Sequence, residues 1–452
     1  MEKIIPLYYK RYADYVNKFK MLPNAVDGTI PVYRRLLLTL HQHAPNKFAK
    51  SPEITGNTTA KYHPFGDPYG SLVNLVQNGF AIGDGNFGFD IGILGISKDG
   101  SGDSSTRKTR AAAARYTSVK ANPVIEDMAF KYIRSVEWKE SEMNPQPDTL
   151  PIRFPLCLFG KNEFSMIAIG FKTDIPTYEL KDLKRRLFYL LGKTKTEPVI
   201  APNIKNCTVV SSKNELKKLL TTGTAKIKIN GTYEIDKVKH RVYIKGWNPR
   251  INFDTLLNKI DSYKGYNLLS SEDIGFLDES DYDNPKNIRF EVLRKRNTSI
   301  IFDKMVDAIN NVLEASLSYN MYAVDDKDKV RLVSVDEMLL LAYNHYTQAF
   351  IKHNTDQIEK YKQIENEYDI IDKIRPYISE STNKSSGVEM IKFISLKSGV
   401  KSDDIKTIID KYKIKKLLSV KTDKSVIEKS IKDATNRLND PEKYILEEYK
   451  NI

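Results

Sequence analysis

Residues 26–43, VDGTIPVYRRLLLTLHQH, decide the fold of the N-terminal part of this chain. The glycine and the proline mark a turn, and the leucines that follow recur at the spacing of one helix face. A second helix is expected to begin in KSPEITGNTTAKYH (residues 50–63), with Ser51 as its N-cap and Pro52 at its first position. Two short helices in succession, followed by a glycine-rich stretch, predict a helix-turn-helix or winged-helix module.

The length and charge of the chain limit its class. Its 452 residues exceed one ordinary core, so about two to four domains are expected. The formal net charge of +13 favours a polyanionic partner, most simply nucleic acid. A lysine-rich composition of the kind that AT-rich genomes produce explains the charge equally well. Two cysteines, Cys157 and Cys207, exclude a disulfide framework and a cysteine-rich zinc site. With no secretory leader and no apolar run of about 20 residues, we expect a cytoplasmic protein without membrane contact.

The pattern of apolar and polar residues changes at two points along the rest of the chain. From about residue 126, short strand-like segments and one clear helix predict an α/β region, in which Asn230-Gly231 has the sequence of a hairpin turn. The last third is helical, and apolar residues recur from Leu339 to Ile371 at spacings of mainly three and four. This pattern is typical of one arm of a coiled coil, and residues 424–440 are the expected returning arm.

A tyrosine in cationic surroundings is the candidate for chemistry. It lies in AAAARYTSVK (residues 111–120), where Arg115 precedes Tyr116, and STRKTR lies just upstream. A phenol has a pKa of about 10. It therefore attacks only when its anion is stabilised or its proton is removed, and neighbouring cations also hold a phosphodiester in place. This setting suits attack on a nucleic-acid phosphate. With 26 tyrosines in the chain, a buried packing tyrosine is the ordinary alternative.

Four motifs in a fixed order resolve that choice. VDGTIPVYRR (26–35), KYHPFGD (61–67), GDGNFG (83–88) and AAAARYT (111–117) occur at compatible spacing. Together they resemble the DNA-cleaving A-type subunit of type IIA DNA topoisomerases, the family of the gyrase and topoisomerase IV A subunits. The resemblance continues through PDTLPIRFP, MIAIGFKTDIPTYEL and IGFLDESDYD and covers nearly the whole chain. Any one motif is unspecific, but the ordered set around the tyrosine is specific.

The resemblance implies an α+β multidomain fold with four parts. Residues 1–25 would form an N-terminal helical arm that contacts the partner subunit. Residues 26–125 would form a winged-helix DNA-gate domain that carries the tyrosine, and residues 126–330 an α/β tower domain. Residues 331–452 would form a long antiparallel coiled coil that ends in a C-terminal dimer gate.

The resemblance also implies a role for individual residues. Tyr116 matches the nucleophile that joins the 5′ end of broken DNA, and Arg115 matches the cation that stabilises the scissile phosphate. His63 matches a histidine near that phosphate, and Lys20 stands where the family usually has a catalytic arginine. Ile167 matches an isoleucine that wedges between base pairs and bends the DNA. The other implied DNA-binding positions are basic: Arg34, Arg35, Lys61, Arg107, Lys108 and Arg110.

Four positions depart from the family pattern. Lys20 keeps the charge of the arginine but loses its bidentate fork. Ile30 replaces a lysine and Phe65 replaces a second histidine, so one phosphate contact and one polar group are lost. Pro68 stands where a small hydroxyl residue commonly helps to hold quinolone drugs, which argues against ordinary quinolone binding.

Two components of the expected reaction are missing from the sequence. Near the tyrosine there is no clustered Asp-x-Asp motif for Mg²⁺, and DESD (278–281) is expected to make structural contacts; no Walker-type motif for ATP is present. The resemblance implies that a separate TOPRIM/ATPase B-type subunit binds Mg²⁺ and ATP, in an A2B2 heterotetramer with double-stranded DNA. Two copies of this chain would pair at the DNA gate and at the coiled-coil gate.

The last residue, Ile452, follows soon after the returning arm, whereas the gyrase A-type chain continues into a DNA-wrapping domain. Relaxation and decatenation are therefore expected rather than negative supercoiling. A short A-type chain of AT-rich composition also resembles those of large bacteriophages.

Two other functions compete with this interpretation. A tyrosine recombinase or relaxase would need an Arg/His constellation or a paired-histidine metal site at other spacings. A non-catalytic, architectural DNA-binding dimer is the second alternative, and the departures at Lys20, Ile30 and Phe65 favour it. Replacing Tyr116 with Phe separates an enzyme from a scaffold, because only the enzyme would lose an activity.

Overall fold

A computed structural model gives the fold of the chain. Helices and strands are mixed along it, which confirms the predicted α+β class. Two compact units divide the chain, Met1–Tyr346 and Thr347–Ile452. The four-part division predicted from the sequence, and the winged-helix, tower and coiled-coil assignments, stay predictions. The structure describes residues 4–88, 111–140, 143–251, 253–261, 274–278, 290–296, 301–381, 387–419 and 424–451.

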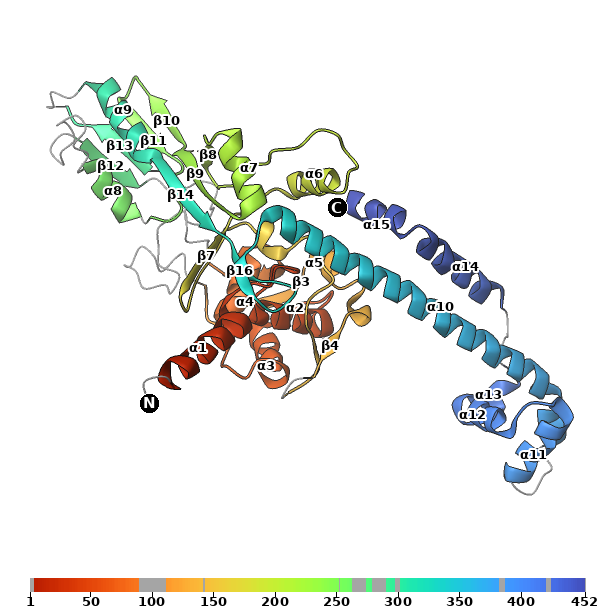
Figure 1. Cartoon of the computed structure of the whole chain (residues 1–452). Helices are drawn as coiled ribbons and strands as arrows, with labels where there is room; N and C mark the ends of the chain where they lie inside the picture. The colour runs from red at the N-terminus through yellow and green to blue at the C-terminus, as the bar shows by residue number, and fades with distance from the viewer. Residues whose placement is uncertain are drawn as a thin grey trace. The chain divides into compact units, whose positions relative to one another are not determined.

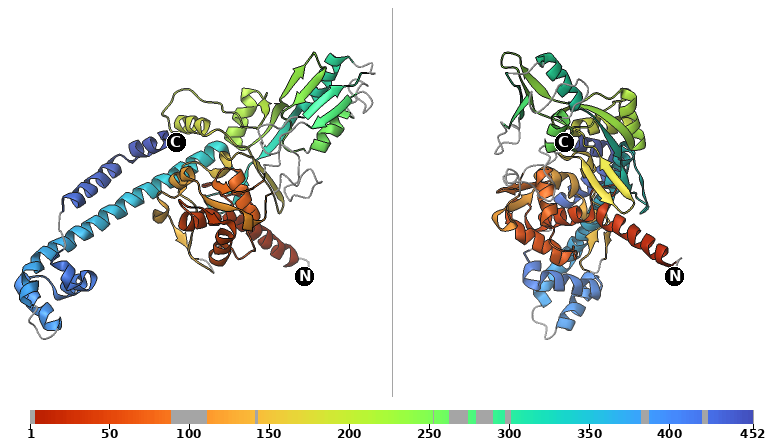
Figure 2. Two further views of the ribbon diagram at one scale, coloured as in Figure 1. Left: turned by 180° about the vertical axis from the view of Figure 1, so that it is seen from behind. Right: turned by 90° about the vertical axis from the view of Figure 1, so that its left-hand side faces the viewer.

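Four helices dominate the N-terminal part of the first unit (Figure 1). The apolar face of α2 forms its core, since Leu36 and Leu40 are fully buried, and Pro31 occupies the first turn of α2, where a missing N–H costs nothing. Both views of Figure 2 show α1 projecting away from the other three helices. The four helices are α1 (Ile4–Val16), α2 (Pro31–His43), α3 (Ser51–Lys61) and α4 (Tyr69–Gln77), and a short π-helical turn, η1 (Asn17–Met21), follows α1.

The expectation that Ser51 caps α3 is wrong. Lys50 is the capping residue and makes no side-chain hydrogen bond there. The Ser51 hydroxyl is instead 2.7 Å from the hydroxyl of Thr117, 66 residues away in the sequence. The local pattern predicts that the Ser51 hydroxyl caps the helix, but this hydroxyl contacts a residue that is distant in the sequence instead.

A small antiparallel sheet lies beside these helices and has its strands in the order β1-β3-β2. The register pairs Ala49 with Val119 and Asp84 with Ser118, so the central strand follows directly after the tyrosine motif. The sheet thereby fixes the end of that motif against the helices. The strands are β1 (Ala49–Lys50), β2 (Ala81–Asp84) and β3 (Ser118–Ala121).

Short elements connect this part to the larger sheets. The helix α5 is capped by Asn122, whose side chain accepts a hydrogen bond from the amide of Val124. The connecting elements are the helix α5 (Pro123–Ala129), the 3-10 turns η4 (Ile133–Ser135) and η5 (Leu156–Leu158), and the paired strands β4 (Trp138–Lys139) and β5 (Gln146–Pro147).

A five-stranded antiparallel sheet, in the order β6-β7-β14-β9-β8, follows. The sequence Asn230-Gly231 does not form the predicted hairpin turn but ends β9, where Asn230 pairs with Glu314 and Gly231 with Cys207. The carbonyl of Gly246 approaches so closely that a Cβ on Gly231 would lie 2.3 Å from it, so close packing rather than a turn requires this glycine. The elements are β6 (Phe164–Ala168), β7 (Phe171–Ile175), α6 (Leu180–Leu190), β8 (Cys207–Val209), α7 (Lys213–Thr222), β9 (Thr224–Gly231) and β14 (Glu314–Asn320).

A four-stranded antiparallel sheet, in the order β10-β11-β13-β12, carries a core of its own with α8 and α9. Val242 and Val292 from the sheet and Met305 from α9 are fully buried in that core. Alternating residues of β11 point into it, as a strand with one buried face requires. The elements are β10 (Tyr233–Asp236), β11 (Arg241–Ile244), α8 (Phe253–Asp261), β12 (Ile274–Asp278), β13 (Phe290–Arg294) and α9 (Phe302–Leu313).

The hairpin of β15 (Tyr322–Val324) and β16 (Val330–Leu332) leads into α10 (Val335–Ser381), which begins in the first unit and continues through the second. In the second unit, the end of α10 packs with the helices that follow it on a core that includes Ile371 and Ile408. Figure 1 and the left view of Figure 2 show α14 running in the direction opposite to α10. The remaining helices are α11 (Gly387–Ser398), α12 (Ser402–Tyr412), α13 (Ile414–Leu417), α14 (Ser425–Asn439) and α15 (Pro441–Lys450). Among the helices that the structure describes, none is long and apolar enough to cross a membrane.

Candidate active site

Tyr116 ends a single 3-10 turn, η3 (Ala114–Tyr116), and Thr117 separates this turn from β3. Its amide donates to the carbonyl of Ala113 (2.9 Å), while its side chain is 64% exposed. The guanidinium carbon of Arg115 lies 4.6 Å from the centroid of the Tyr116 ring, within cation–π range. The turn therefore presents a phenol and a cation together at the surface, and this arrangement contradicts the alternative of a buried packing tyrosine.

The backbone around Tyr116 is held on two sides. The amide of Ser51 donates to the carbonyl of Thr117 (3.1 Å), and the amide of Ala112 donates to the carbonyl of Asn86 (2.8 Å). Gly85 has a φ of +94°, and a Cβ there would lie 2.8 Å from the carbonyl oxygen of Tyr116. Gly85, the second glycine of the GDGNFG motif, therefore allows the chain to approach the turn that carries the tyrosine.

A second group of candidate residues surrounds His63. The guanidinium of Arg35 donates to the side chain of Gln146 (2.9 Å), and its other arm lies 3.1 Å from Nδ1 of His63. Since an arginine only donates, Nδ1 is the acceptor and a neutral His63 carries its proton on Nε2. Burial, and then the charges of Arg35 and Lys20, lower the pKa of His63 below its usual value. This histidine is therefore predominantly neutral at pH 7 in the DNA-free protein.

Phe65 joins Lys20 to this group. The ammonium of Lys20 lies 3.9 Å from the centroid of the Phe65 ring, and the edge of that ring meets His63 at a centroid distance of 5.4 Å. Two residues that depart from the family pattern are therefore in contact with one another. We call Lys20, Arg35, His63 and Phe65 the cationic cluster.

Arg34 and Lys61 have partners within the protein. Arg34 forms an ion pair with the fully buried carboxylate of Asp27 (2.7 Å), and its own side chain is only 13% exposed. Asp27 also accepts hydrogen bonds from the amides of Thr29 and Leu150. Lys61 lies 2.8 Å from Nε2 of His43. The ion pair gives Arg34 a structural role, and its predicted contact with DNA stays a prediction.

Ile167 is 75% exposed on β6. It pairs with Lys172 of β7, near a tight turn at Gly170, whose φ is +80°. The hairpin thus holds an apolar side chain in solvent, as a wedge would require. The other predicted DNA contacts, Arg107, Lys108 and Arg110, lie outside the described residues.

The sequence matches one family of known proteins. A family model for the A subunits of DNA gyrase and topoisomerase IV matches residues 20–451. The chain belongs to this family. It is 24% identical to the A subunit of DNA topoisomerase 4 from Streptococcus pneumoniae over 417 residues, which covers 87% of this chain and 48% of that protein. It is 29% identical to the DNA gyrase A subunit of Clostridium acetobutylicum (77% and 42% covered) and 27% identical to that of Neisseria gonorrhoeae (78% and 39% covered). The chain thus spans less than half the length of these relatives.

The candidate residues of this gyrase A-family chain form two groups that α3 connects. The first turn of α3 holds Thr117 through Ser51, and His63 follows two residues after its last residue, Lys61. An 11-residue helix spans about 16 Å. The turn of Tyr116 is therefore attached to the N-terminal end of α3, and His63 of the cationic cluster lies just beyond its C-terminal end.

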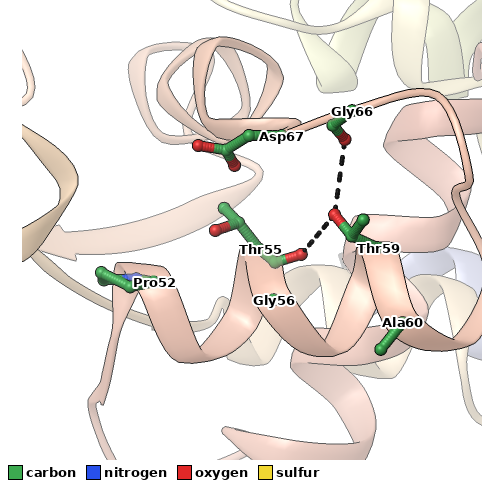
Figure 3. A pocket seen from close by; sticks show the side chains of 7 residues that line it. All are labelled: Pro52, Thr55, Gly56, Thr59, Ala60, Gly66 and Asp67. Atoms are coloured by element: carbon green, nitrogen blue, oxygen red, sulfur yellow. Dashed lines mark hydrogen bonds between the residues drawn. The ribbon is translucent and has the colours of Figure 1, made fainter.

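A depression of about 380 Å³ lies along α3 (Figure 3). The hydroxyl of Thr59 donates to the carbonyl of Thr55 (2.9 Å) and is 3.4 Å from the carbonyl of Gly66, so it ties the following loop to the helix. The depression includes none of the predicted catalytic residues. It is lined by Pro52, Thr55, Gly56, Thr59, Ala60, Gly66 and Asp67.

The residues around Tyr116 do not fit a metal site. The side chains that contact its turn are hydroxyls and a guanidinium, and within the part of the chain that the structure describes no three His, Cys, Asp or Glu side chains gather to hold an ion. Mg²⁺ has a strong preference for carboxylate oxygens. A metal at this tyrosine would thus need ligands other than the described side chains that contact its turn.

Proposed function

We propose that this chain is the DNA-breaking and rejoining subunit of an ATP-dependent type II topoisomerase that relaxes and decatenates DNA. The observation that carries the proposal is the exposed Tyr116, with Arg115 against its ring, on a turn fixed by hydrogen bonds. The membership of the chain in the family of gyrase and topoisomerase IV A subunits supports the same reaction.

The proposed reaction is a reversible transfer of a phosphoryl group. The phenolic oxygen of Tyr116 forms a bond to the phosphorus of a DNA phosphodiester, and the bond from phosphorus to the 3′ oxygen breaks. The phenol loses its proton, the departing 3′ oxygen gains one, and the 5′ end stays joined to the tyrosine. Arg115 stabilises the charge on the phosphate, and attack by the 3′ hydroxyl reverses the reaction. Mg²⁺ on the partner subunit would stabilise the departing oxygen.

The cationic cluster is proposed to bind DNA phosphate. Lys20, Arg35 and His63 present cationic and N–H groups side by side, and burial, followed by repulsion from Arg35 and Lys20, lowers the pKa of His63. A phosphate would relieve that repulsion. Ile167, exposed on its hairpin, is the proposed wedge that bends the duplex.

The proposed assembly is an A2B2 heterotetramer, in which the B-type subunit binds Mg²⁺ and ATP. An arm of residues 1–25 would contact that B-type chain, since Tyr8, Tyr9 and Tyr12 of α1 are 60% to 64% exposed. The DNA-gate, tower and coiled-coil assignments of residues 26–125, 126–330 and 331–452 belong to the same proposal. Two copies would pair at the DNA gate and at the end of the coiled coil.

The second candidate function is an architectural DNA-binding dimer without catalysis. Phe65 and Lys20 depart from the family pattern, and Ile30, where the family has a lysine, is buried. These substitutions would weaken phosphate contacts without removing the net positive charge. The close contact between Lys20 and Phe65 favours the enzyme instead, because the two substitutions together keep a cation at the site.

The test is cleavage of supercoiled plasmid by the full chain mixed with the TOPRIM/ATPase protein of the same genome, with Mg²⁺ and a detergent-and-protease trap. We expect linear DNA with blocked 5′ ends, absent for Tyr116→Phe and present for the control Tyr361→Phe in the second unit. Intact plasmid in every sample, together with a gel shift that shows binding, would support the architectural dimer.

A further inference from the structure

Tyr69, the first residue of α4, touches the backbone that carries the candidate nucleophile. Its hydroxyl donates to the carbonyl of Ala112 at 2.6 Å and lies 3.2 Å from the hydroxyl of Thr117. Ala112 precedes Tyr116 by four residues, and Thr117 follows it directly. One side chain therefore reaches the backbone two residues before the turn that presents the nucleophile and the residue directly after that turn.

The protons in this cluster can be assigned one by one. Thr117 is fully buried and donates to the carbonyl of Ala114 (3.1 Å), so its oxygen accepts from the hydroxyl of Ser51 (2.7 Å). The hydroxyl of Tyr69 donates its proton to Ala112. The hydroxyls of Ser51, Thr117 and Tyr69 thus each have one acceptor. Two of these acceptors, the carbonyls of Ala114 and Ala112, lie within four residues of Tyr116.

Tyr69 itself is held in place by its backbone and by the packing of α4. The amide of Tyr69 donates to the carboxylate of Asp67 (3.2 Å), and α4 begins at once. Farther along α4, Leu72 and Leu75 are fully buried, and the helix packs against α2. Helix α4 is thereby tied to α2, and Tyr69 extends that rigid frame to the turn of Tyr116.

We propose that Tyr69 is a positioning residue for DNA cleavage: its hydroxyl holds the turn of Tyr116 in register with α4 and with the KYHPFGD loop that precedes α4. The inference rests on the proposed function, because it assigns Tyr69 to the cleavage that Tyr116 would perform. Near-attack geometry tolerates little displacement, so releasing the Ala112 carbonyl lowers the fraction of productive complexes.

The test compares Tyr69→Phe with a matched control, Tyr233→Phe. Both tyrosines are half-buried in the first unit, and the Tyr233 hydroxyl also donates to one acceptor, the side chain of Asn310 (3.2 Å), but away from the turn. We expect Tyr69→Phe to reduce detergent-trapped cleavage by about five- to tenfold, the effect of one lost hydrogen bond. Plasmid binding in a gel shift should stay within about twofold, and Tyr233→Phe should cleave normally.

A purely structural role would give a different pattern. Equal losses in the two variants, or losses that track their melting temperatures, would overturn the proposal, as would normal cleavage by Tyr69→Phe. Thr117→Ser, which keeps the hydroxyl, should retain cleavage. Persistence of cleavage in Tyr116→Phe would instead refute the proposed nucleophile, so failure of the function and failure of the positioning role are separate results.

Discussion

Arg34 belongs to a pair of arginines predicted to contact DNA, yet its guanidinium is committed to Asp27. Two of its three nitrogens, Nε and Nη2, lie 2.7 Å and 3.3 Å from the oxygens of a carboxylate that is fully buried. The same carboxylate accepts from Thr29 and Leu150, so it is anchored where it stands. Replacing Arg34 with Ala would leave this buried charge without its cation.

The expected cost of Arg34→Ala is large. Removing one partner of a buried ion pair destabilises a protein by about 3–5 kcal/mol. At roughly 2 °C per kcal/mol for a large domain, the melting temperature should fall by about 6–10 °C. The matched control is Arg185→Ala, because Arg185 pairs with Asp182 on α6 while its own side chain is 65% exposed. Exposed pairs contribute about 0–1 kcal/mol, so this control should melt close to the unmodified protein.

Thermal denaturation followed by circular dichroism measures this difference, and a gel shift on short duplex DNA measures binding at a temperature where both variants are folded. A large drop in melting temperature for Arg34→Ala, with nearly unchanged binding, is the expected result. If Arg34→Ala melts like Arg185→Ala but binds DNA much more weakly, the structural assignment is wrong and Arg34 is a phosphate contact.

Two further predictions concern the cationic cluster. Phe65→Leu removes the aromatic ring beside Lys20, and such a cation–π contact contributes about 0.5–1 kcal/mol at an exposed site. Trapped cleavage should therefore fall about two- to fivefold in Phe65→Leu and stay normal in Phe65→Tyr. Equal activity of the two variants would show that the ring does not position Lys20. The pKa of His63 is lowered in the folded protein, so the unfolded chain binds more protons below about pH 6.5 and stability falls as the pH falls through that window. Between about pH 7.5 and about pH 5.5, the melting temperature of His63→Gln should therefore fall less than that of the unmodified protein. If the melting temperatures of both proteins fall equally with pH, the pKa of His63 is not lowered by folding.

Local patterns in the sequence predict helices well but assign side-chain partners poorly. The α2 and α3 segments are predicted from their Gly/Pro turn and first-turn proline, and both helices are present. The local pattern assigns Ser51 to a helix cap, yet its hydroxyl contacts Thr117. Asn230-Gly231 has the sequence of a turn, yet its pairing with β8 and β14 extends the strand through it. In each case a contact between distant segments outweighed a local preference.

The same reason explains which site residues the sequence could reveal. Arg115 and Tyr116 are adjacent in the chain, so their contact is visible in the motif itself. Tyr69 is 43 residues from Ala112, and no spacing rule connects them. Its only sequence signal is its place at the start of the helix after KYHPFGD, one residue beyond the proline that departs from the family pattern.

Under the proposed function, the cationic cluster is arranged for phosphate before DNA binds. Burial, and then the charges of Arg35 and Lys20, lower the pKa of His63, so protonation of this histidine is unfavourable without an anion nearby. Folding energy from elsewhere in the first unit holds these groups in place, so a phosphate that enters finds its donors already ordered. A bound phosphate would stabilise the protonated imidazole and raise the pKa of His63, so proton uptake on DNA binding at about pH 6.5 is the expected consequence. A wild-type complex that takes up no more protons than His63→Gln would show that the phosphate does not reach this cluster.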